Sequence, residues 1–304
     1  MLSFRCSPPH GIFAETFAKM ELNQIYNEDC IEGMKRIPDA SIDVILTDPP
    51  YKYLPEDFDR DFDEGAFFKE ADRVLKPDGW IILFGRGTSF YRWNTRLAEI
   101  GYHFKEEIIW DKCYNSSPTA VLQRFHETIS VHCKGTASIR KCRVPYMEKR
   151  VPDTDKIISD IKRLSVILHN PTELASVEDY LRTGNLEYFG TSRPMGITVQ
   201  ATLPSPSRCA SVARSMKEGL LEASIIKIRR DHYNTIHPTQ KPVRLLERLL
   251  NLVIPEQTGI ILDPFSGSGS TALACKNTGR DFIGFEIDQK YWAAAVERLQ
   301  KKEK

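Results

Sequence analysis

The sequence lacks several features that would place it in a specialised class of protein. No apolar run approaches the roughly 20 residues that a membrane-spanning helix needs. The first 19 residues contain no continuous apolar core of the kind found in secretory signals. The seven cysteines are dispersed without a Cys-x-x-Cys pair, which argues against a disulfide framework and a zinc site. These absences predict a cytoplasmic protein with reduced thiols, no metal ion and no membrane partner.

The sequence also has almost no net charge, with 42 basic and 41 acidic residues and a formal charge of +1. The distribution is uneven, because residues 135–232 carry 16 Lys and Arg against 11 Asp and Glu. A basic surplus of this kind can supply phosphate contacts to a nucleic acid. A merely solvated surface would look similar, so charge alone does not identify a partner.

What the sequence does contain is an alternation of strand-like and helix-like segments. The β-branched run from Ile42 to Thr47 predicts a strand, which two prolines at 49 and 50 prevent from continuing. Further strands are expected at 23–26, 80–84, 104–110, 128–133, 259–262 and 282–285, and helices at 65–75, 90–100, 242–253, 270–277 and 289–299. This alternation predicts an α/β protein with a doubly wound, largely parallel sheet covered by helices on both faces.

The alternation lapses between residues 135 and 232, where Ser, Pro, Arg and Thr are frequent and short helical pieces are expected at 155–168, 173–181 and 211–220. We therefore predict one domain built from residues 20–134 and 233–304, interrupted by an inserted segment at 135–232. Met20 begins a stretch that reads like a natural start, so residues 1–19 are expected to be an N-terminal extension.

A glycine-rich motif, Asp263-Pro264-Phe265-Ser266-Gly267-Ser268-Gly269, follows one predicted strand and opens a helix. Doubly wound sheets bind nucleosides at this position, and glycines let the backbone approach a ligand closely. Asp263 can accept a hydrogen bond from a cationic amine, which suits an amino-acid moiety better than a pyrophosphate. Glu286 ends the next strand, where a carboxylate grips a ribose diol. An ordinary turn followed by a surface glutamate fits this context poorly.

A second motif, Asp48-Pro49-Pro50-Tyr51, ends an apolar strand. The exocyclic amine of adenine or cytosine is a poor nucleophile because its lone pair is delocalised into the ring. A carboxylate and a backbone carbonyl that both accept from the amine would stabilise the positive charge of its methylation. Tyr51 offers a face on which a flipped base can stack. On its own, the motif is equally compatible with a strand-ending turn.

Together the two motifs resemble the amino-methyltransferases of DNA, which methylate adenine N6 or cytosine N4 with S-adenosylmethionine. The catalytic motif precedes the cofactor motif, with a long variable segment between them, which resembles the β-type circular permutation of the family. The segments 26–30, 108–112, 126–127 and 237–242 also look familial. The resemblance implies a Rossmann-like methyltransferase sheet in which residues 135–232 form a target recognition domain.

The resemblance implies specific roles for two sets of residues. The catalytic set is Asp48, Pro49, Pro50 and Tyr51. The cofactor set is Asp29, His237, Thr239, Lys241, Asp263, Pro264, Phe265, Gly267, Ser268, Gly269 and Glu286. Within the inserted segment, basic charge alone makes Arg140, Lys141 and Arg143 candidate DNA contacts, and for each a solvated surface position is an equal alternative.

The expected function is site-specific methylation of a flipped adenine in double-stranded DNA. Adenine is preferred because Asp rather than Ser begins the catalytic motif. The alternatives are a cytosine-N4 DNA methyltransferase, an RNA methyltransferase and a non-catalytic cofactor- or DNA-binding protein, although an intact catalytic motif speaks against the last. A homodimer and a cognate restriction endonuclease stay open as partners.

Overall fold

The structure, a computed structural model, describes residues 20–51, 60–114, 121–150, 156, 160, 214–230, 235–237 and 239–301. The expected N-terminal extension and, apart from 156 and 160, the expected helices at 155–168 and 173–181 lie outside these residues. The chain divides into two compact units, Met1–Arg140 with Ala223–Lys304, and Lys141–Glu222. The second unit is narrower at both ends than the segment 135–232 that composition marks as inserted.

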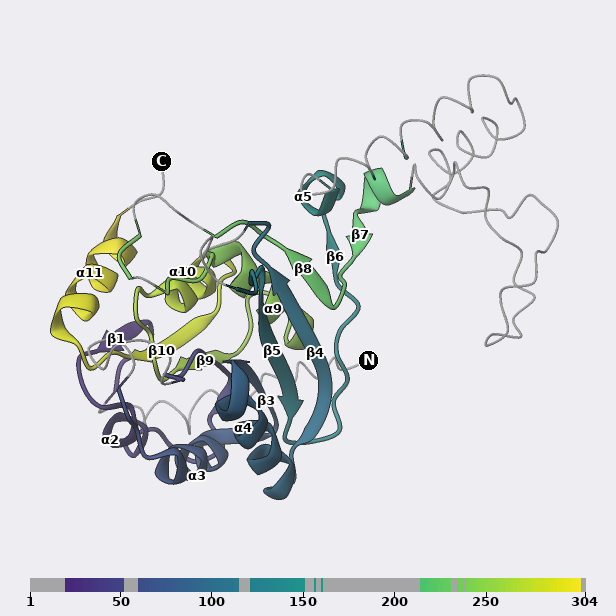
Figure 1. Ribbon diagram of the computed structural model, residues 1–304. Helices are drawn as coiled ribbons and strands as arrows, with labels where there is room; N and C mark the ends of the chain where they lie inside the picture. Colours follow the sequence, from purple (N-terminus) through teal and green to yellow (C-terminus); the bar gives the residue numbers. More distant parts are fainter. Residues whose placement is uncertain are drawn as a thin grey trace, which may run out of the picture. The chain divides into compact units, whose positions relative to one another are not determined.

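The larger unit contains an eight-stranded sheet of order β1-β10-β9-β2-β3-β5-β4-β8 (Figure 1). Neighbours from β1 to β3 are parallel, β5 runs antiparallel to both β3 and β4, and β8 is parallel to β4. The strands are β1 (Gln24–Tyr26), β2 (Ile42–Thr47), β3 (Leu75–Gly85), β4 (His103–Asp111), β5 (His126–Cys133), β8 (Ile225–Lys227), β9 (Ile260–Asp263) and β10 (Asp281–Phe285). The predicted α/β class with a largely parallel sheet is confirmed.

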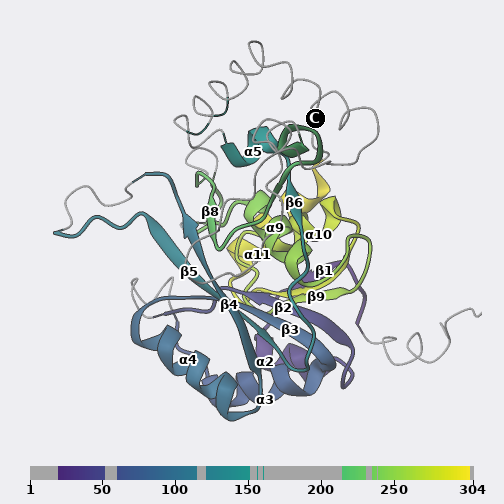
Figure 2. The same cartoon turned by 90° about the vertical axis from the view of Figure 1, so that its right-hand side faces the viewer.

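Helices cover both faces of this sheet (Figure 2). One face carries α2 (Cys30–Met34), α3 (Glu64–Val74) and α4 (Gly87–Glu99), and the other carries α9 (Val243–Val253), α10 (Ser270–Asn277) and α11 (Gln289–Gln300). Apolar side chains of α3 and α4, including Phe67 and Trp93, pack with sheet residues such as Leu83 in one buried cluster. The described part of the chain contains no helix long and apolar enough to cross a membrane.

Two stretches of the sheet differ from the sequence prediction. The strand expected at 80–84 begins earlier, at Leu75, so Lys76 to Gly79 lie inside β3, where an irregularity lets Leu75 pair with Ile42 and Trp80 with Val44. The ammonium of Lys76 holds both carboxylate oxygens of Asp43 at 2.8 Å, which favours an extended path. Strand β8 was not predicted, because it lies within the stretch 135–232 where the alternation of strand-like and helix-like segments lapses.

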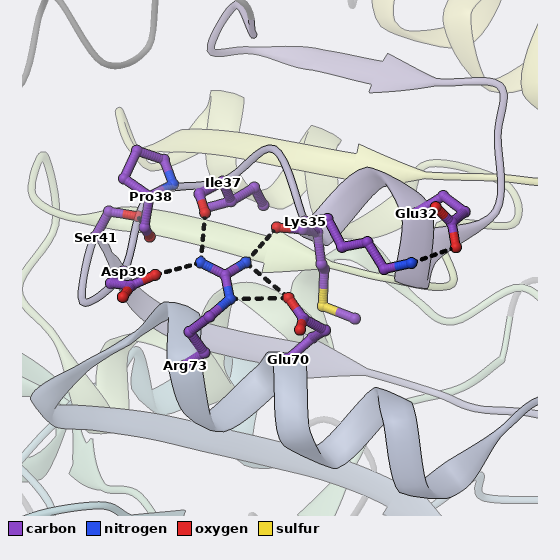
Figure 3. A network of polar contacts seen from close by, with 9 residues as sticks. Glu32, Lys35, Ile37, Pro38, Asp39, Ser41, Glu70 and Arg73 are labelled. Atoms are coloured by element: carbon purple, nitrogen blue, oxygen red, sulfur yellow. Dashed lines mark hydrogen bonds and ion pairs between the residues drawn. The ribbon is translucent and has the colours of Figure 1, made fainter.

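One arginine ties the first helices of the larger unit together (Figure 3). The guanidinium of Arg73, near the end of α3, donates to the carbonyl oxygens of Met34 at 2.7 Å and Ile37 at 2.8 Å. It also pairs with the carboxylates of Glu70 and Asp39. A planar group with five donors can satisfy the carbonyls that end a helix, so Arg73 fastens the α2–β2 connection onto α3.

The smaller unit is described only near its two ends. Strands β6 (Arg143–Val144) and β7 (Leu220–Leu221) pair antiparallel, α5 (Tyr146–Arg150) follows β6, and residues 214–218 are helical. The amide of Glu222 donates to the carbonyl of Cys142 at 2.9 Å, so the unit begins and ends at neighbouring positions.

Candidate active site

The site lies where the sheet changes direction. Strands β2 and β9 are adjacent and parallel, yet β2 leads through α3 to β3 on one side while β9 leads through α10 to β10 on the other. Asp48 follows β2 and Asp263 ends β9, so both carboxylates meet at the carboxyl ends of the strands. Doubly wound sheets bind ligands at such a switch point. A cavity of about 230 Å³ opens there.

Nearly every residue that the family resemblance assigned to catalysis or to the cofactor lines this one cavity. The lining includes Asp29, Asp48, Pro49, Pro50, Tyr51, His237, Thr239, Lys241, Asp263, Pro264, Phe265, Gly267, Ser268 and Glu286. Gly269 does not line it. This glycine instead begins α10 with φ +71°, and an added Cβ would lie 3.1 Å from the Cβ of Ala295, so the turn and the packing of α11 require it.

Asp263 is a strongly perturbed carboxyl of the cavity. Burial, with a smaller contribution from the negative charges of Asp48 and Glu286, raises its pKa to about 7 against hydrogen bonds from Thr271 and the amide of Phe265. A buried carboxyl of this kind gains most from a cationic hydrogen-bond partner. The side chain is therefore suited to binding an ammonium group.

Glu286 is held in a fixed orientation by the backbone. Its two carboxylate oxygens accept from the amides of Gly267 and Asp288, each at 2.8 Å. Burial raises the pKa of Glu286 above its ordinary value, and these two amides oppose the shift. The fixed carboxylate retains acceptor capacity for a diol, since each oxygen has two lone pairs.

Asp29 has two functions in the structure. Its Oδ1 caps α2 by accepting from the amides of Ile31 at 2.9 Å and Glu32 at 3.2 Å, while the residue lines the cavity. An aspartate at this position is a favoured N-cap. The sequence analysis assigned the residue to the cofactor and did not anticipate the capping role.

The segment from His237 to Lys241 contributes two unlike side chains. The imidazole Nδ1 of His237 lies 2.9 Å from the hydroxyl of Thr239, the ring packs against Tyr291, and burial lowers the pKa of His237 to about 4. Lys241 points to the catalytic motif: its Nζ binds Asp48 and lies 3.2 Å from Glu127. Sequence reasoning placed Lys241 with the cofactor and gave Glu127 no role.

Tyr51 is half-buried in the wall of the cavity, with its ring centroid 6.0 Å from that of Trp93. Several other lining residues were not anticipated, namely Glu28, Arg60, Asp61, Phe62, Phe84, Gln240, Ile287, Asp288 and Tyr291. Asp288 alone had a usable signal, because an aspartate just before a predicted helix is a typical N-cap. Glu28 and Gln240 lie in the two segments that look familial but were given no role, and the others come from positions that no local pattern marks.

The three candidate DNA contacts have different surroundings. The guanidinium of Arg140 donates to the carbonyls of Asn251 and Ile254, both at 2.9 Å, at the carboxyl end of α9. Arg143 donates to the carbonyl of Gly219 at 2.9 Å and pairs with Glu218 at 3.2 Å. Lys141 is exposed. The first two side chains thus have structural partners that their charge did not reveal.

The chain resembles known DNA methyltransferases in sequence. The profile of the N6/N4 DNA methylase family matches residues 42–297. The Type II methyltransferase M.HinfI of Haemophilus influenzae is 27% identical over 92% of this chain and 68% of its own length. M.BglII, a Type II methyltransferase of Bacillus subtilis, is also 27% identical, over 93% of this chain and 71% of its own.

Solved structures agree on the fold. The complex of M1.HpyAVI with S-adenosylmethionine gives a TM-score of 0.53 at 21% identity, covering 90% of this chain and 98% of that one. The cytosine-N4-specific PvuII DNA methyltransferase gives 0.56 at 16% identity, covering 92% and 87%. With the carboxylate-lined cavity at the switch point and a family match over most of its length, this chain belongs to the N6/N4 DNA methyltransferase family.

Proposed function

We propose that this protein transfers a methyl group from S-adenosylmethionine to the N6 amine of a flipped adenine in double-stranded DNA. The observation that carries the proposal is the Asp48-Pro49-Pro50-Tyr51 motif in the same cavity as Asp263 and Glu286. An aspartate at the first position of the motif favours adenine over cytosine by family resemblance. Similarity to a cytosine-N4-specific structure concerns the fold alone and leaves this preference unaffected.

The cavity suits S-adenosylmethionine by the chemistry of its acceptors. Asp263, buried and with its pKa raised to about 7, fits the amino group of the methionine part, and the backbone-held Glu286 fits the ribose hydroxyls. Asp29 also lines the cavity and is assigned to the cofactor adenine by family resemblance, and Phe265 forms an aromatic wall together with Phe62, their centroids 5.1 Å apart. When bound, S-adenosylmethionine supplies an electrophilic methyl group on a sulfonium.

The catalytic motif would prepare the amine for direct transfer. The carboxylate of Asp48 and the carbonyl of Pro49 would accept hydrogen bonds from its two N–H groups, which turns the lone pair towards the methyl donor and stabilises the developing positive charge. Tyr51 stacks on the extruded base and holds it at this position. The proton leaves to Asp48 or to water once the new N–C bond has formed, so no covalent intermediate with the protein is needed.

We further propose that the unit Lys141–Glu222 reads the DNA sequence. It is a separate compact unit, and its 12 Lys and Arg against 10 Asp and Glu include the exposed Lys141. Arg143 belongs to the same unit, although its ion pair with Glu218 would have to rearrange to reach a phosphate. Arg140 is bound to the end of α9, so we propose it as an anchor ahead of the unit.

The test is to identify the product. DNA from cells that express the protein is digested to nucleosides and analysed by mass spectrometry, with the Asp48→Ala variant as the control. N6-methyladenine is expected for the wild type and its loss for the variant. N4-methylcytosine would contradict the adenine assignment and keep the enzyme class, whereas methylated RNA with unmodified DNA would overturn the DNA substrate.

A further inference from the structure

A row of alternating charges runs behind the catalytic aspartate. Asp48 binds the Nζ of Lys241, Lys241 lies 3.2 Å from Oε2 of Glu127, and Oε1 of Glu127 lies 3.5 Å from the Nζ of Lys112. The side chain of Lys241 is only 9% exposed and that of Lys112 only 7%. The four residues come from three separate parts of the fold: the end of β2, the loop before α9, and the β4–β5 hairpin.

We propose that Lys241 and Glu127 are positioning residues for methyl transfer: Lys241 holds the Asp48 carboxylate as an oriented anion, and Glu127 offsets the charge of Lys241. The inference rests on the proposed role of Asp48 as the acceptor of the target amine. Neither residue needs to touch DNA or cofactor to act in this way.

The first step concerns Lys241. Burying an ammonium is costly unless it is paired, and this one is packed against the ring of Phe84, 5.0 Å from its centroid. Burial lowers the pKa of Lys241, but Asp48 and Glu127 together raise it above its ordinary value. The side chain therefore stays charged across the neutral range and fixes one oxygen of Asp48 in place.

The second step concerns Glu127. Burial raises its pKa, but Lys241, Lys112 and more distant Arg230 outweigh burial, so the pKa of Glu127 lies below its ordinary value. A lysine beside the reacting amine opposes the positive charge that methylation develops. An ionised Glu127 cancels this opposition, and the four charges of the row sum to zero. Removing either inner charge leaves the cavity with a net charge next to Asp48.

The other charged groups around Asp48 come from several elements. Asp263 of β9 and Glu286 of β10 interact through the cavity, and His237 is neutral because burial lowers its pKa to about 4. Arg230, after β8, acts electrostatically on Glu127, Lys112 and His237. Lys241 is in direct contact with the Asp48 carboxylate, so its removal strengthens the mutual repulsion of the carboxylates around Asp48. Adjacent carboxylates bind a proton at higher pH than an isolated one.

This reasoning predicts a specific pattern of turnover in single-turnover assays at saturating DNA and cofactor. Lys241→Met should lower the rate about 10–100-fold, the scale of losing a preorganised electrostatic partner. The acid limb of its pH–rate profile should move up by about one unit or more because Asp48 and Glu127 now repel each other. Lys241→Arg should restore part of the rate, and Glu127→Gln should slow transfer without moving the limb upwards.

The double variant Lys241→Met/Glu127→Gln separates electrostatics from packing. It removes both charges, so the acid limb should return towards the wild-type position and the rate should exceed that of Lys241→Met alone. Lys76→Met, which breaks a lysine–aspartate pair at the other end of β2, is the matched control and should keep the wild-type pH profile. Lys76→Met should also leave S-adenosylmethionine affinity unchanged in calorimetry.

Additive losses in the double variant, or an unshifted limb in Lys241→Met, would overturn the proposal and reduce the row to a structural ion pair. Thermal denaturation identifies a variant that has simply lost its fold. In that case the proposal is tested with Lys241→Arg and Glu127→Gln, which change the side-chain volume little, by measuring their rates and pH profiles. A fully active Asp48→Ala would instead refute the underlying role of Asp48, so the two failures are distinguishable.

Discussion

The two ends of strand β2 carry the same pair of residue types with different surroundings. At the amino end, Asp43 pairs with Lys76 at 2.8 Å and also accepts from the amide of Ile260 at 2.9 Å. At the carboxyl end, Asp48 pairs with Lys241 at the wall of the cavity. The side chain of Lys76 is 38% exposed and that of Lys241 is 9% exposed. The Asp43 carboxylate therefore has a structural role, because it binds a backbone amide. The Asp48 carboxylate instead faces a ligand site.

The largest expected effect contrasts these two aspartates directly. Asp48→Ala should lower turnover by about a hundredfold or more, because an electrostatic partner of the transition state is lost, with little change in cofactor affinity. Asp43→Ala should do the opposite and cost about 1–2 kcal/mol of unfolding free energy, mainly through the unsatisfied Ile260 amide. Single-turnover rates and urea denaturation of both variants test these two expectations. Equal effects on the rate would erase the distinction between the two ends.

An intermediate effect concerns pH and the cofactor. The pKa of Asp263 is raised to about 7 from 3.8, so the neutral acid is favoured in the free protein below pH 7. The same shift stabilises the ligand-free fold at low pH, a contribution lost as pH rises through about 7. A cationic ligand prefers the ionised form, so binding should release a proton.

S-adenosylmethionine affinity should therefore rise by up to about tenfold per pH unit between about pH 5.5 and 7, below the usual α-amino pKa of roughly 7.7–8.0. Calorimetry in buffers of different ionisation enthalpy measures both the affinity and the released proton. Asp263→Asn should bind weakly at every pH and release none. A wild-type affinity independent of pH would mean that another group receives the amine.

The smallest expected effect sharpens the contrast between structural and DNA-facing basic residues. Lys141→Ala should reduce the salt slope of DNA affinity by about 0.9, the value for one phosphate contact. Arg140→Ala should leave that slope unchanged and lower stability instead, since it frees two carbonyls at the end of α9. Salt titrations of binding with both variants test this. A lowered slope for Arg140→Ala alone would reverse the assignment.

The sequence predicted the local parts of this protein well. The two motifs follow strands that periodicity identifies, so the placement of Asp48 and Asp263 at one edge of a parallel sheet was accessible from pattern alone. The inner members of the charge row were not, because Lys241 is 193 residues from Asp48 and no local pattern links them. The extended path of Lys76 to Gly79 was also missed, since it depends on an ion pair to Asp43 across the sheet.

Arg140 illustrates the limit of reasoning from charge. Its sequence neighbours are basic, which suggested a phosphate contact, but the carbonyls that it binds belong to a helix more than a hundred residues further along the chain. Composition predicts the sign of the charge in a segment but not the hydrogen-bond partners of its individual side chains. The compact unit Lys141–Glu222 is shorter than the segment 135–232 that composition marks, because β8 pairs with β4 in the main sheet.

The hydrogen bond between Glu222 and Cys142 holds the first and last residues of the inserted unit close together. A segment whose two ends already touch can be lengthened, shortened or replaced without stretching the scaffold, since closing the gap it leaves costs little chain entropy. Insertions at such points are well tolerated in other folds. With the proposed role of this unit in reading DNA, its sequence could diverge while the catalytic site stays constant, and target specificity would transfer together with the unit.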